Sequence, residues 1–170
     1  MLPPSEGSID IFLQPGELYF GDRHTRIRTL LGSCVSITLW NPWLKIGGMC
    51  HFMLPTRGHV GPHLDGRYGD EALALLLREI RASRSRPGDY EVKLFGGGNM
   101  FPEHCSRHDK LSVPKRNVES ARRMLKAHGL VIHAEHVGGS GHRQLIFDVG
   151  NGHVWLRHRA LGHEQERDNA

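Results

Sequence analysis

The sequence has few cysteines, few aromatic residues and no long apolar run, and each scarcity excludes a class of protein. Three cysteines stand in 170 residues, and the first residues, MLPPSEGSIDIFL, lack the basic and apolar regions of a secretory signal. A disulfide framework is therefore not expected, and the cysteines are expected to be free thiols in a reducing cytoplasm. The longest helix-like apolar run, ALALLL at 72–77, is too short to cross a bilayer, so no membrane insertion is expected.

The basic residues gather in two stretches, 78–88 and 115–126, and neither stretch contains an aromatic residue. Surfaces that bind nucleic acids usually interleave aromatic with basic side chains, or belong to a recognised module. The net charge of +4 is also modest. Solvated helix faces are thus favoured, no nucleic-acid partner is expected, and attraction to an acidic protein surface is the remaining alternative.

The length and composition indicate one soluble globular domain over residues 1–170. Hydrophobic residues make up 38% and charged residues 24% of the chain, which is enough apolar material for one substantial core. No internal repeat or low-complexity linker interrupts it. The core is expected over about 15–158, followed by a polar, frayed tail at 160–170.

The hydrophobic periodicity predicts an α+β fold with mixed, largely antiparallel sheets covered by helices. The sequence GNG at 150–152 indicates a hairpin between the last two strands. Pro114 suits the first turn of the second helix, and Gly129 ends it. Strands are predicted at 17–22, 27–40, 45–54, 90–95, 130–137, 144–149 and 153–157, and helices at 66–84 and 114–128.

One hairpin holds the most informative pair of residues, Cys34 and His51. If the loop is NPWL (41–44), Trp40 faces Lys45 and Cys34 lies directly across from His51, with Cβ atoms about 4.5–5.5 Å apart. A bulge at Gly47–Gly48 would shift this register. Cys50 points to the opposite face and is expected in the core, across from Val35.

Two interpretations of Cys34 stay open from the residues alone, a buried structural thiol and a nucleophile. The turn at Gly32 and Ser33 could expose the sulfur and turn backbone N–H groups toward an oxyanion. A protonated His51 would lower the thiol pKa and hold a thiolate–imidazolium pair. A separate group, Cys105 with His104 and His108, lacks a fourth zinc ligand, so neither a metal nor an organic cofactor is expected.

The motifs together resemble the CheD family of chemoreceptor glutamine deamidases. The resemblance rests on LGSCV (31–35), KIGGMCHFMLP (45–55), RYGDEAL (67–73), KLFGGGNMF (93–101), KRNVE (115–119) and GGSGHR (138–143). It implies a three-layer α/β/α fold like that of cytotoxic necrotizing factor toxins. It also implies hydrolysis of particular glutamine side chains of receptors in bacterial chemotaxis, with methylesterase activity in some members. The implied partners are the cytoplasmic helices of methyl-accepting receptors and a CheC-type phosphatase.

The resemblance assigns the nucleophile to Cys34 and the histidine to His51. The threonine of the family lies six residues before the cysteine, where this chain has Arg28, and Thr29 stands at five. Thr29 is therefore the candidate that orients His51. The alternatives are an ordinary strand threonine, with a backbone carbonyl orienting the ring, or a chain offset by one residue near Leu31.

Two rival functions also remain. One is a cysteine hydrolase with another substrate, such as a peptidase or a transglutaminase-like enzyme. The other is a non-catalytic adaptor that binds receptors or a CheC-type phosphatase, which Arg28 at the expected threonine position keeps open.

Overall fold

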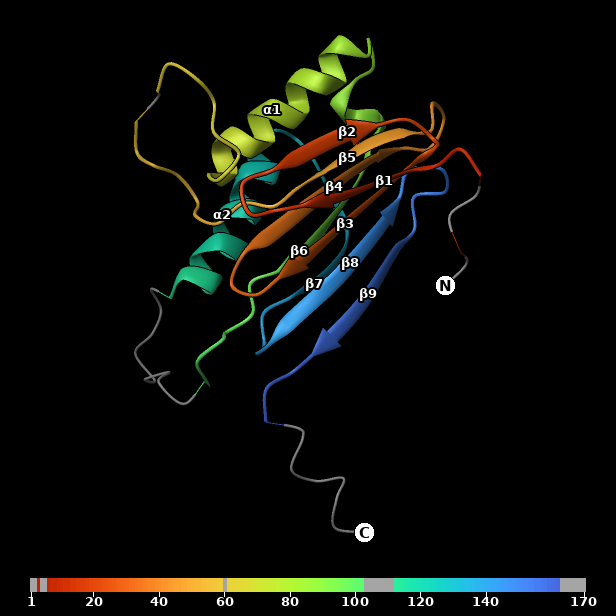
Figure 1. Cartoon of the computed structure of the whole chain (residues 1–170). Coiled ribbons are helices and arrows are strands. Elements are labelled where there is room, and N and C mark those ends of the chain that lie inside the picture. The colour runs from red at the N-terminus through yellow and green to blue at the C-terminus, as the bar shows by residue number, and fades with distance from the viewer. Residues whose placement is uncertain (1–2, 4–5, 60, 103–111, 163–170) are drawn as a thin grey trace.

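Two β-sheets and two α-helices make up the computed structural model of the chain (Figure 1). The structure describes residues 3, 6–59, 61–102 and 112–162. Its elements are β1 (Ile9–Leu13), β2 (Leu18–Gly21), β3 (Thr25–Leu31), β4 (Val35–Asn41), β5 (Ile46–Cys50), α1 (Gly69–Ala82), the short 3₁₀-helix Pro87–Asp89, β6 (Glu91–Gly96), α2 (Val113–Ala127), β7 (Ile132–Val137), β8 (His142–Asp148) and β9 (Val154–Arg159).

The strands form a four-stranded sheet, in the order β1-β3-β8-β9, and a five-stranded sheet, in the order β2-β5-β4-β6-β7. The pairs β1/β3 and β6/β7 are parallel, and the other neighbours are antiparallel. The predicted α+β class with mixed, largely antiparallel sheets is therefore confirmed. The hairpin predicted from GNG is confirmed as well, because β8 and β9 pair around it.

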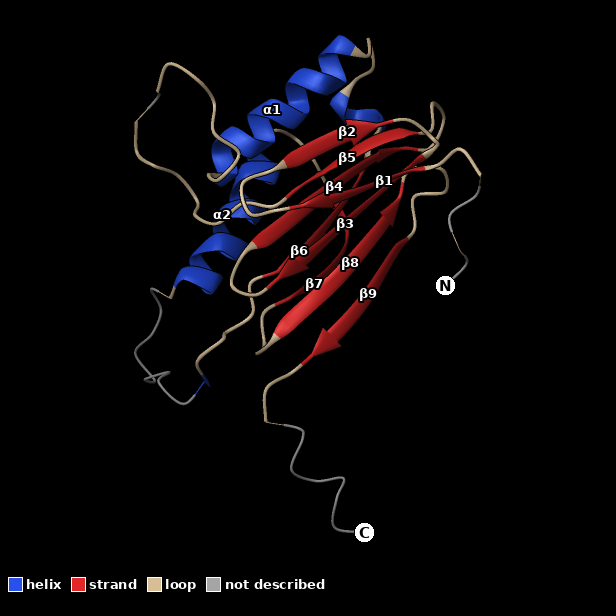
Figure 2. Ribbon diagram, viewed as in Figure 1, coloured by secondary structure: helices blue, strands red, loops and turns tan. Residues whose placement is uncertain are grey.

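The layers stack as helices, five-stranded sheet and four-stranded sheet (Figure 2). One core lies between both helices and the five-stranded sheet, and its members include Ile37, Leu76 and Leu125. A second core lies between the two sheets and includes Ile27 and Phe147. The third layer is thus a second sheet. The α/β/α order implied by the resemblance has a layer of helices in that position.

Both helices form where the apolar stripes predict them, although α1 begins at Gly69 rather than near 66. The buried face of α1 includes Leu73, Leu76 and Ile80. In α2, Pro114 stands in the first turn, where its missing N–H costs no hydrogen bond. These buried stripes hold the helices against the five-stranded sheet.

Three strand predictions differ from the structure. The segment predicted as one strand at 27–40 is two strands, β3 and β4, which belong to different sheets. Strand β1 was not predicted, because its exposed Ile9 and Phe12 and its five-residue length give a weak alternating pattern. The segment 45–54 ends as a strand at Cys50. The candidate ligands His104, Cys105 and His108, and most of the predicted tail, lie outside the described residues.

Within the described part of the chain, neither helix combines the length and apolar character that crossing a membrane requires.

Candidate functional site

Cys34 lies where the chain passes from one sheet to the other. The strand β3 ends at Leu31 in the four-stranded sheet, and β4 starts at Val35 in the five-stranded sheet. The intervening residues bend sharply, and Cys34 is half-buried against the core between the sheets. A thiol on such a bend is held by two sheets yet keeps part of its surface open to solvent.

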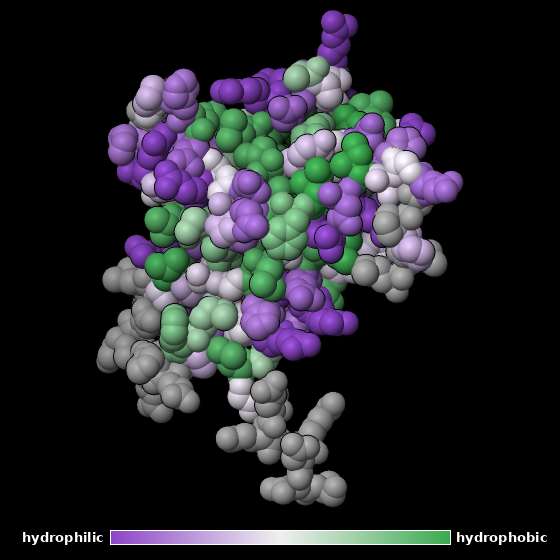
Figure 3. All heavy atoms as spheres, in the orientation of Figure 1, coloured by the Kyte–Doolittle hydropathy of each residue, from purple (hydrophilic) through white to green (hydrophobic). Residues whose placement is uncertain are grey.

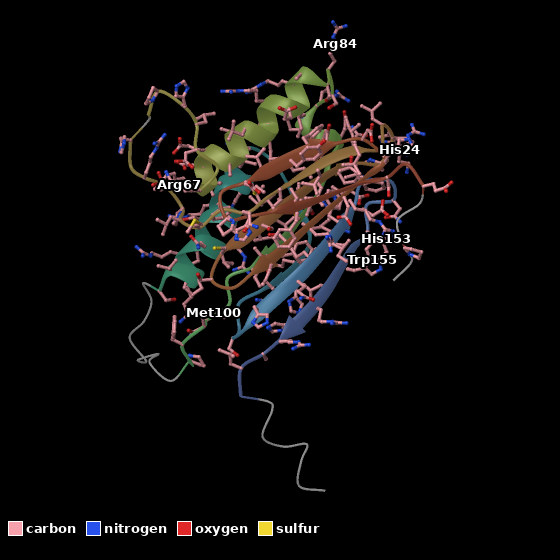
Figure 4. The ribbon with its side chains drawn as sticks, in the orientation of Figure 1. His24, Arg67, Arg84, Met100, His153 and Trp155 are labelled. Atoms are coloured by element: carbon pink, nitrogen blue, oxygen red, sulfur yellow. The ribbon has the colours of Figure 1, made fainter. Side chains whose placement is uncertain are left out.

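The glycine loop after β6 holds this bend in place. The N–H of Gly97 donates to the carbonyl of Cys34 at 2.9 Å, and the N–H of Gly98 donates to that of Gly32 at 2.9 Å. A Cβ atom on Gly96 would lie 2.3 Å from the Cys34 carbonyl oxygen, so only glycine permits this approach. Met100, which follows the glycine loop and is labelled in Figure 4, packs beside Gly32.

The predicted register between Cys34 and His51 is wrong by two residues. Asn41 pairs with Ile46, so the loop covers 42–45 rather than 41–44. The Asn41 side chain closes this loop by accepting hydrogen bonds from the N–H groups of the second and third loop residues. The glycine pair forms no bulge, because both glycines pair regularly with β4.

Cys34 and His51 are consequently diagonal neighbours. The bridge between Val35 and Phe52 sets Met53 across from Cys34. A displacement of two residues preserves the alternation of side chains, so Cys34 and His51 still point to the same side, toward the four-stranded sheet. Diagonal partners are typically about 7–8 Å apart, within reach of a long side chain but farther than the predicted direct pair.

His51 is buried, and Thr29 of the opposite sheet orients its ring. The Oγ1 of Thr29 lies 2.7 Å from Nδ1 of His51 and donates to the carbonyl of Leu13 at 2.9 Å. Because a hydroxyl has one proton and that proton goes to Leu13, the Thr29 oxygen accepts from His51. The proton of a neutral imidazole is thereby assigned to Nδ1, and Nε2 is left with a lone pair.

The Nε2 atom of His51 is buried and has no hydrogen-bond partner among the described residues. The Cys34 sulfur therefore makes no hydrogen bond with it in this conformation. Hydrogen bonds between catalytic groups are often long or absent without substrate, so the separation does not exclude proton transfer after binding. An imidazole fixed at Nδ1 with a free Nε2 is arranged as a general base.

Burial keeps both members of the pair neutral. It raises the pKa of the Cys34 thiol, with a smaller opposing effect from a hydrogen bond with Ser33. It also lowers the pKa of His51 to about 4, although the nearby backbone carbonyl of Leu13 and the charge of Glu17 oppose this. The resting state favoured by burial is a thiol beside a neutral imidazole, and not the expected ion pair.

Arg28 and Cys50 lie away from this site. Arg28 is exposed on the outer face of the four-stranded sheet, where its Nε lies 2.8 Å from the carboxylate of Asp10. Cys50 is fully buried in the core against the helices, as predicted, but it lies near Ile37 rather than Val35. Burial raises the pKa of Cys50 to about 12, which makes it an inert thiol.

Sequence reasoning missed two buried polar residues beside the bend, Asn117 and Arg143. Asn117 of α2 is fully buried, and its side chain reaches the segments that carry both Cys34 and His51. Arg143 is 1% exposed and donates to the carbonyls of Gly96 and Gly138. Asn117 belongs to the motif KRNVE and Arg143 to GGSGHR. These family-like motifs were the signal in the sequence that could have identified both residues.

No cluster of three potential metal ligands occurs within the described ranges. Two cavities, of about 460 and 410 Å³, include neither Cys34 nor His51, although Thr29 is among the residues that line the larger one. Exposed apolar side chains instead occur on two segments that reach the bend, the residues after His51 and the loop that contains Met100. We call Met53, Leu54 and Phe101 the apolar rim, and their exposed fractions are 38%, 39% and 71%. Figure 3 shows one face of the molecule, on which apolar side chains gather in patches with polar side chains between them.

Comparisons with known proteins agree with the motifs. The sequence model of a family described as CheD chemotactic sensory transduction matches residues 53–158. This span begins two residues after His51, so it includes neither His51 nor Cys34. Full-length relatives extend the likeness across both residues.

Two relatives are named "Probable chemoreceptor glutamine deamidase CheD" and "Probable chemoreceptor glutamine deamidase CheD 3". The first, from Pseudomonas syringae pv. tomato, is 52% identical over 91% of this chain and 92% of its own length. The second, from Dechloromonas aromatica, is 51% identical over 86% of both chains. A solved structure, the hypothetical protein YfiH of Bacillus licheniformis, covers 69% of this chain and 49% of its own. It is 15% identical with a TM-score of 0.45, too weak a likeness to support a conclusion.

Proposed function

This chain belongs to the CheD family, and from that premise we propose that it is a protein-glutamine deamidase acting on chemoreceptors. Relatives about half identical over most of their length carry that activity in their names. The observation that carries the proposal is the His51 ring, fixed at Nδ1 by Thr29 and unpartnered at Nε2. This ring lies on the same side of the hairpin as the half-buried Cys34 thiol.

The first half of the reaction forms a thioester and releases ammonia. As the Cys34 sulfur attacks the carbonyl carbon of the glutamine side chain, Nε2 of His51 takes the thiol proton. The carbonyl oxygen becomes an oxyanion, which backbone N–H groups at Ser33 and Cys34 stabilise. The tetrahedral intermediate then collapses, the C–N bond breaks, and His51 returns the proton to the leaving nitrogen.

The second half consumes one water molecule. His51 Nε2 removes a proton from water, whose oxygen attacks the thioester carbon and breaks the C–S bond. His51 then gives this proton to the leaving sulfur, so the products are a glutamate side chain and the restored Cys34 thiol. A glutamate methyl ester offers the same acyl group with methanol as the leaving group, so methylesterase activity is included in the proposal.

The apolar rim suits a helical protein substrate better than a small molecule. Met53 lies across from Cys34 and Leu54 follows it in the chain, so exposed apolar residues occur on the segment opposite the nucleophile. A helix that carries apolar side chains three or four residues from its glutamine could rest on the rim. Receptor signalling helices in the cytoplasm are the proposed substrate, and a CheC-type phosphatase remains a predicted partner.

The decisive experiment incubates the protein with the cytoplasmic fragment of a chemoreceptor. Ammonia release and conversion of amide to acid are followed by enzymatic assay and peptide mass spectrometry. The wild type is expected to convert particular glutamines, whereas Cys34→Ala and His51→Ala are not. Conversion that survives Cys34→Ala rejects the mechanism. Receptor binding without conversion by the wild type supports the adaptor function instead.

A further inference from the structure

Asn117 connects the two segments that carry the nucleophile and the base. It lies on α2 and is fully buried. Its Nδ2 donates to the carbonyl of Ser33 at 3.1 Å and to the carbonyl of Met53 at 2.9 Å. Ser33 precedes Cys34, and Met53 follows His51 by two residues, so one amide group spans both segments.

The orientation of this amide follows from its partners. Both are carbonyl oxygens, which only accept hydrogen bonds, so the nitrogen must face them. The Oδ1 atom then points elsewhere, and it is buried without a partner in the part of the chain that the structure describes. Leaving a buried acceptor unpaired is unfavourable, and such groups in native proteins call for a specific reason.

The contact with Ser33 fixes the direction of the next N–H group. The Ser33–Cys34 peptide is trans, so its C=O and N–H bonds point in opposite directions. Since the carbonyl points to α2, the N–H of Cys34 points away from the helix. No acceptor for this N–H occurs among the residues described.

The side away from α2 is also the reactive side. Cys34 packs against the core between the sheets, and His51 contacts Thr29 across that interface. An unpaired N–H on the same side as the thiol and the imidazole is placed to donate to the oxygen of a substrate amide attacked there.

We propose that Asn117 is a positioning residue that aims the Cys34 N–H at the oxyanion of the tetrahedral intermediate. It acts through the Ser33–Cys34 peptide and does not touch the substrate. Its second hydrogen bond, to Met53, keeps the residue opposite Cys34 at a fixed distance from the bend. This inference rests on the proposed deamidase function and adds the residue that sets its transition-state stabilisation.

The test separates oxyanion stabilisation from thiol reactivity. Asn117→Ala and Asn117→Leu remove both hydrogen bonds, and the leucine also preserves side-chain volume. Deamidation of the receptor fragment gives kcat and KM, and iodoacetamide gives the alkylation rate of Cys34, a reaction that forms no oxyanion. Ser120→Ala, which alters another buried polar residue on the same helix, is the matched control.

The kcat of both Asn117 variants is expected to fall by about 10–100-fold. This is smaller than the 10²–10³-fold effect of deleting an oxyanion donor, because the N–H is misdirected and not removed. Their KM and alkylation rate should stay at the wild-type values, and Ser120→Ala should match the wild type throughout. A parallel fall in kcat and alkylation, or unchanged kcat in a folded variant, overturns the inference while the deamidase function stands. A wild type that releases no ammonia overturns the proposed function, and the inference falls with it.

Discussion

At the scale of single residues, the hydroxyl of Thr29 decides which nitrogen of His51 carries the proton. It accepts from Nδ1 and donates to the carbonyl of Leu13, and both contacts are buried. The same ring without this acceptor could hold its proton on Nε2, where it would be useless as a base. The orienting group is thus a neutral hydroxyl, which adds no charge to a buried site.

Thr29→Val removes the hydroxyl while keeping the shape of the side chain, so it tests this role. Amide hydrolysis should fall by about tenfold or more, a part of the 10²–10⁴-fold that a general base contributes. Thr29→Ser keeps the oxygen and should retain most of the activity. Ammonia release measures the effect, and thermal unfolding confirms the fold. Equal activity in Thr29→Val and the wild type would return Thr29 to an ordinary strand residue.

The alkylation rate of Cys34 as a function of pH tests whether the resting pair is neutral. Burial raises the pKa of this thiol above 9, the ordinary pKa of a cysteine thiol. The fraction of reactive thiolate should therefore keep rising as the pH increases past 9. A thiolate–imidazolium pair would instead give a rate that is already constant near neutral pH. Peptide mass spectrometry separates the three cysteines, and buried Cys50 should stay unmodified. A plateau below pH 8 would contradict the neutral pair.

At the scale of secondary structure elements, the break between β3 and β4 explains why the sequence showed the residues but not their contacts. Cys34 and His51 were predicted from spacing and motifs, and Thr29 was predicted from the resemblance alone. Alternation counted through 27–40 as one strand would point Thr29 and Cys34 to opposite faces. The chain changes sheets at Gly32–Cys34, so alternation on one side of the bend does not determine directions on the other.

The hairpin register shows a second limit of sequence patterns. Alternation placed Cys34 and His51 on the same side, which a two-residue displacement does not alter. The displacement itself depends on where the loop begins, and Asn41 decides that by capping the loop with its side chain. An asparagine before proline is a known turn signal, but it does not show whether the asparagine still belongs to the strand.

Gly97 and Gly139 form a matched pair for testing how the glycine loop supports the bend. Their φ angles are +67° and +66°, so alanine should incur the same backbone strain, about 1–2 kcal/mol, at both positions. A Cβ atom on Gly97 would lie 2.3 Å from Val118 of α2, whereas nothing lies within 4 Å of one on Gly139.

Gly97→Ala should therefore lower the free energy of unfolding by about 1–3 kcal/mol more than Gly139→Ala does. It should also reduce activity, because Gly97 holds the Cys34 carbonyl. Urea unfolding and ammonia release measure the two effects. If both variants lose equal stability, the contact between the loop and α2 does not constrain the bend.

At the scale of the whole molecule, the α+β class and the mixed sheets followed from the sequence, whereas the order of layers did not. Residues 25–31 alternate between buried positions and positions on the outer face, where Arg26 is partly buried and Arg28 and Leu30 are exposed. This pattern indicates a sheet with one open face, which antiparallel pairing permits. Local sequence patterns do not determine which of the two sheets the helices pack against, because that packing depends on contacts between residues distant in the sequence.

The site joins the two sheets, so its protonation should affect the stability of the whole fold. His51 belongs to the hairpin of one sheet and contacts Thr29 of the other. Its pKa is lowered from an ordinary 6.5 to about 4, mainly by burial. Between these values the unfolded chain binds a proton that the folded chain does not. The free energy of unfolding should therefore fall as the pH decreases from 6.5 toward 4.

The expected loss from this one group approaches about 3 kcal/mol at the lower end of the range. Urea unfolding at a series of pH values measures it, and His51→Gln, which cannot titrate, is the comparison. Carboxylates titrate in both proteins, so the difference between the two pH profiles isolates the histidine. The free energies of unfolding of the two proteins should converge as the pH falls. Only the wild type has a buried imidazole that is protonated more readily in the unfolded chain. Parallel profiles would show that His51 titrates alike in the folded and unfolded chains. The neutral buried base on which the proposed mechanism depends would then be wrong.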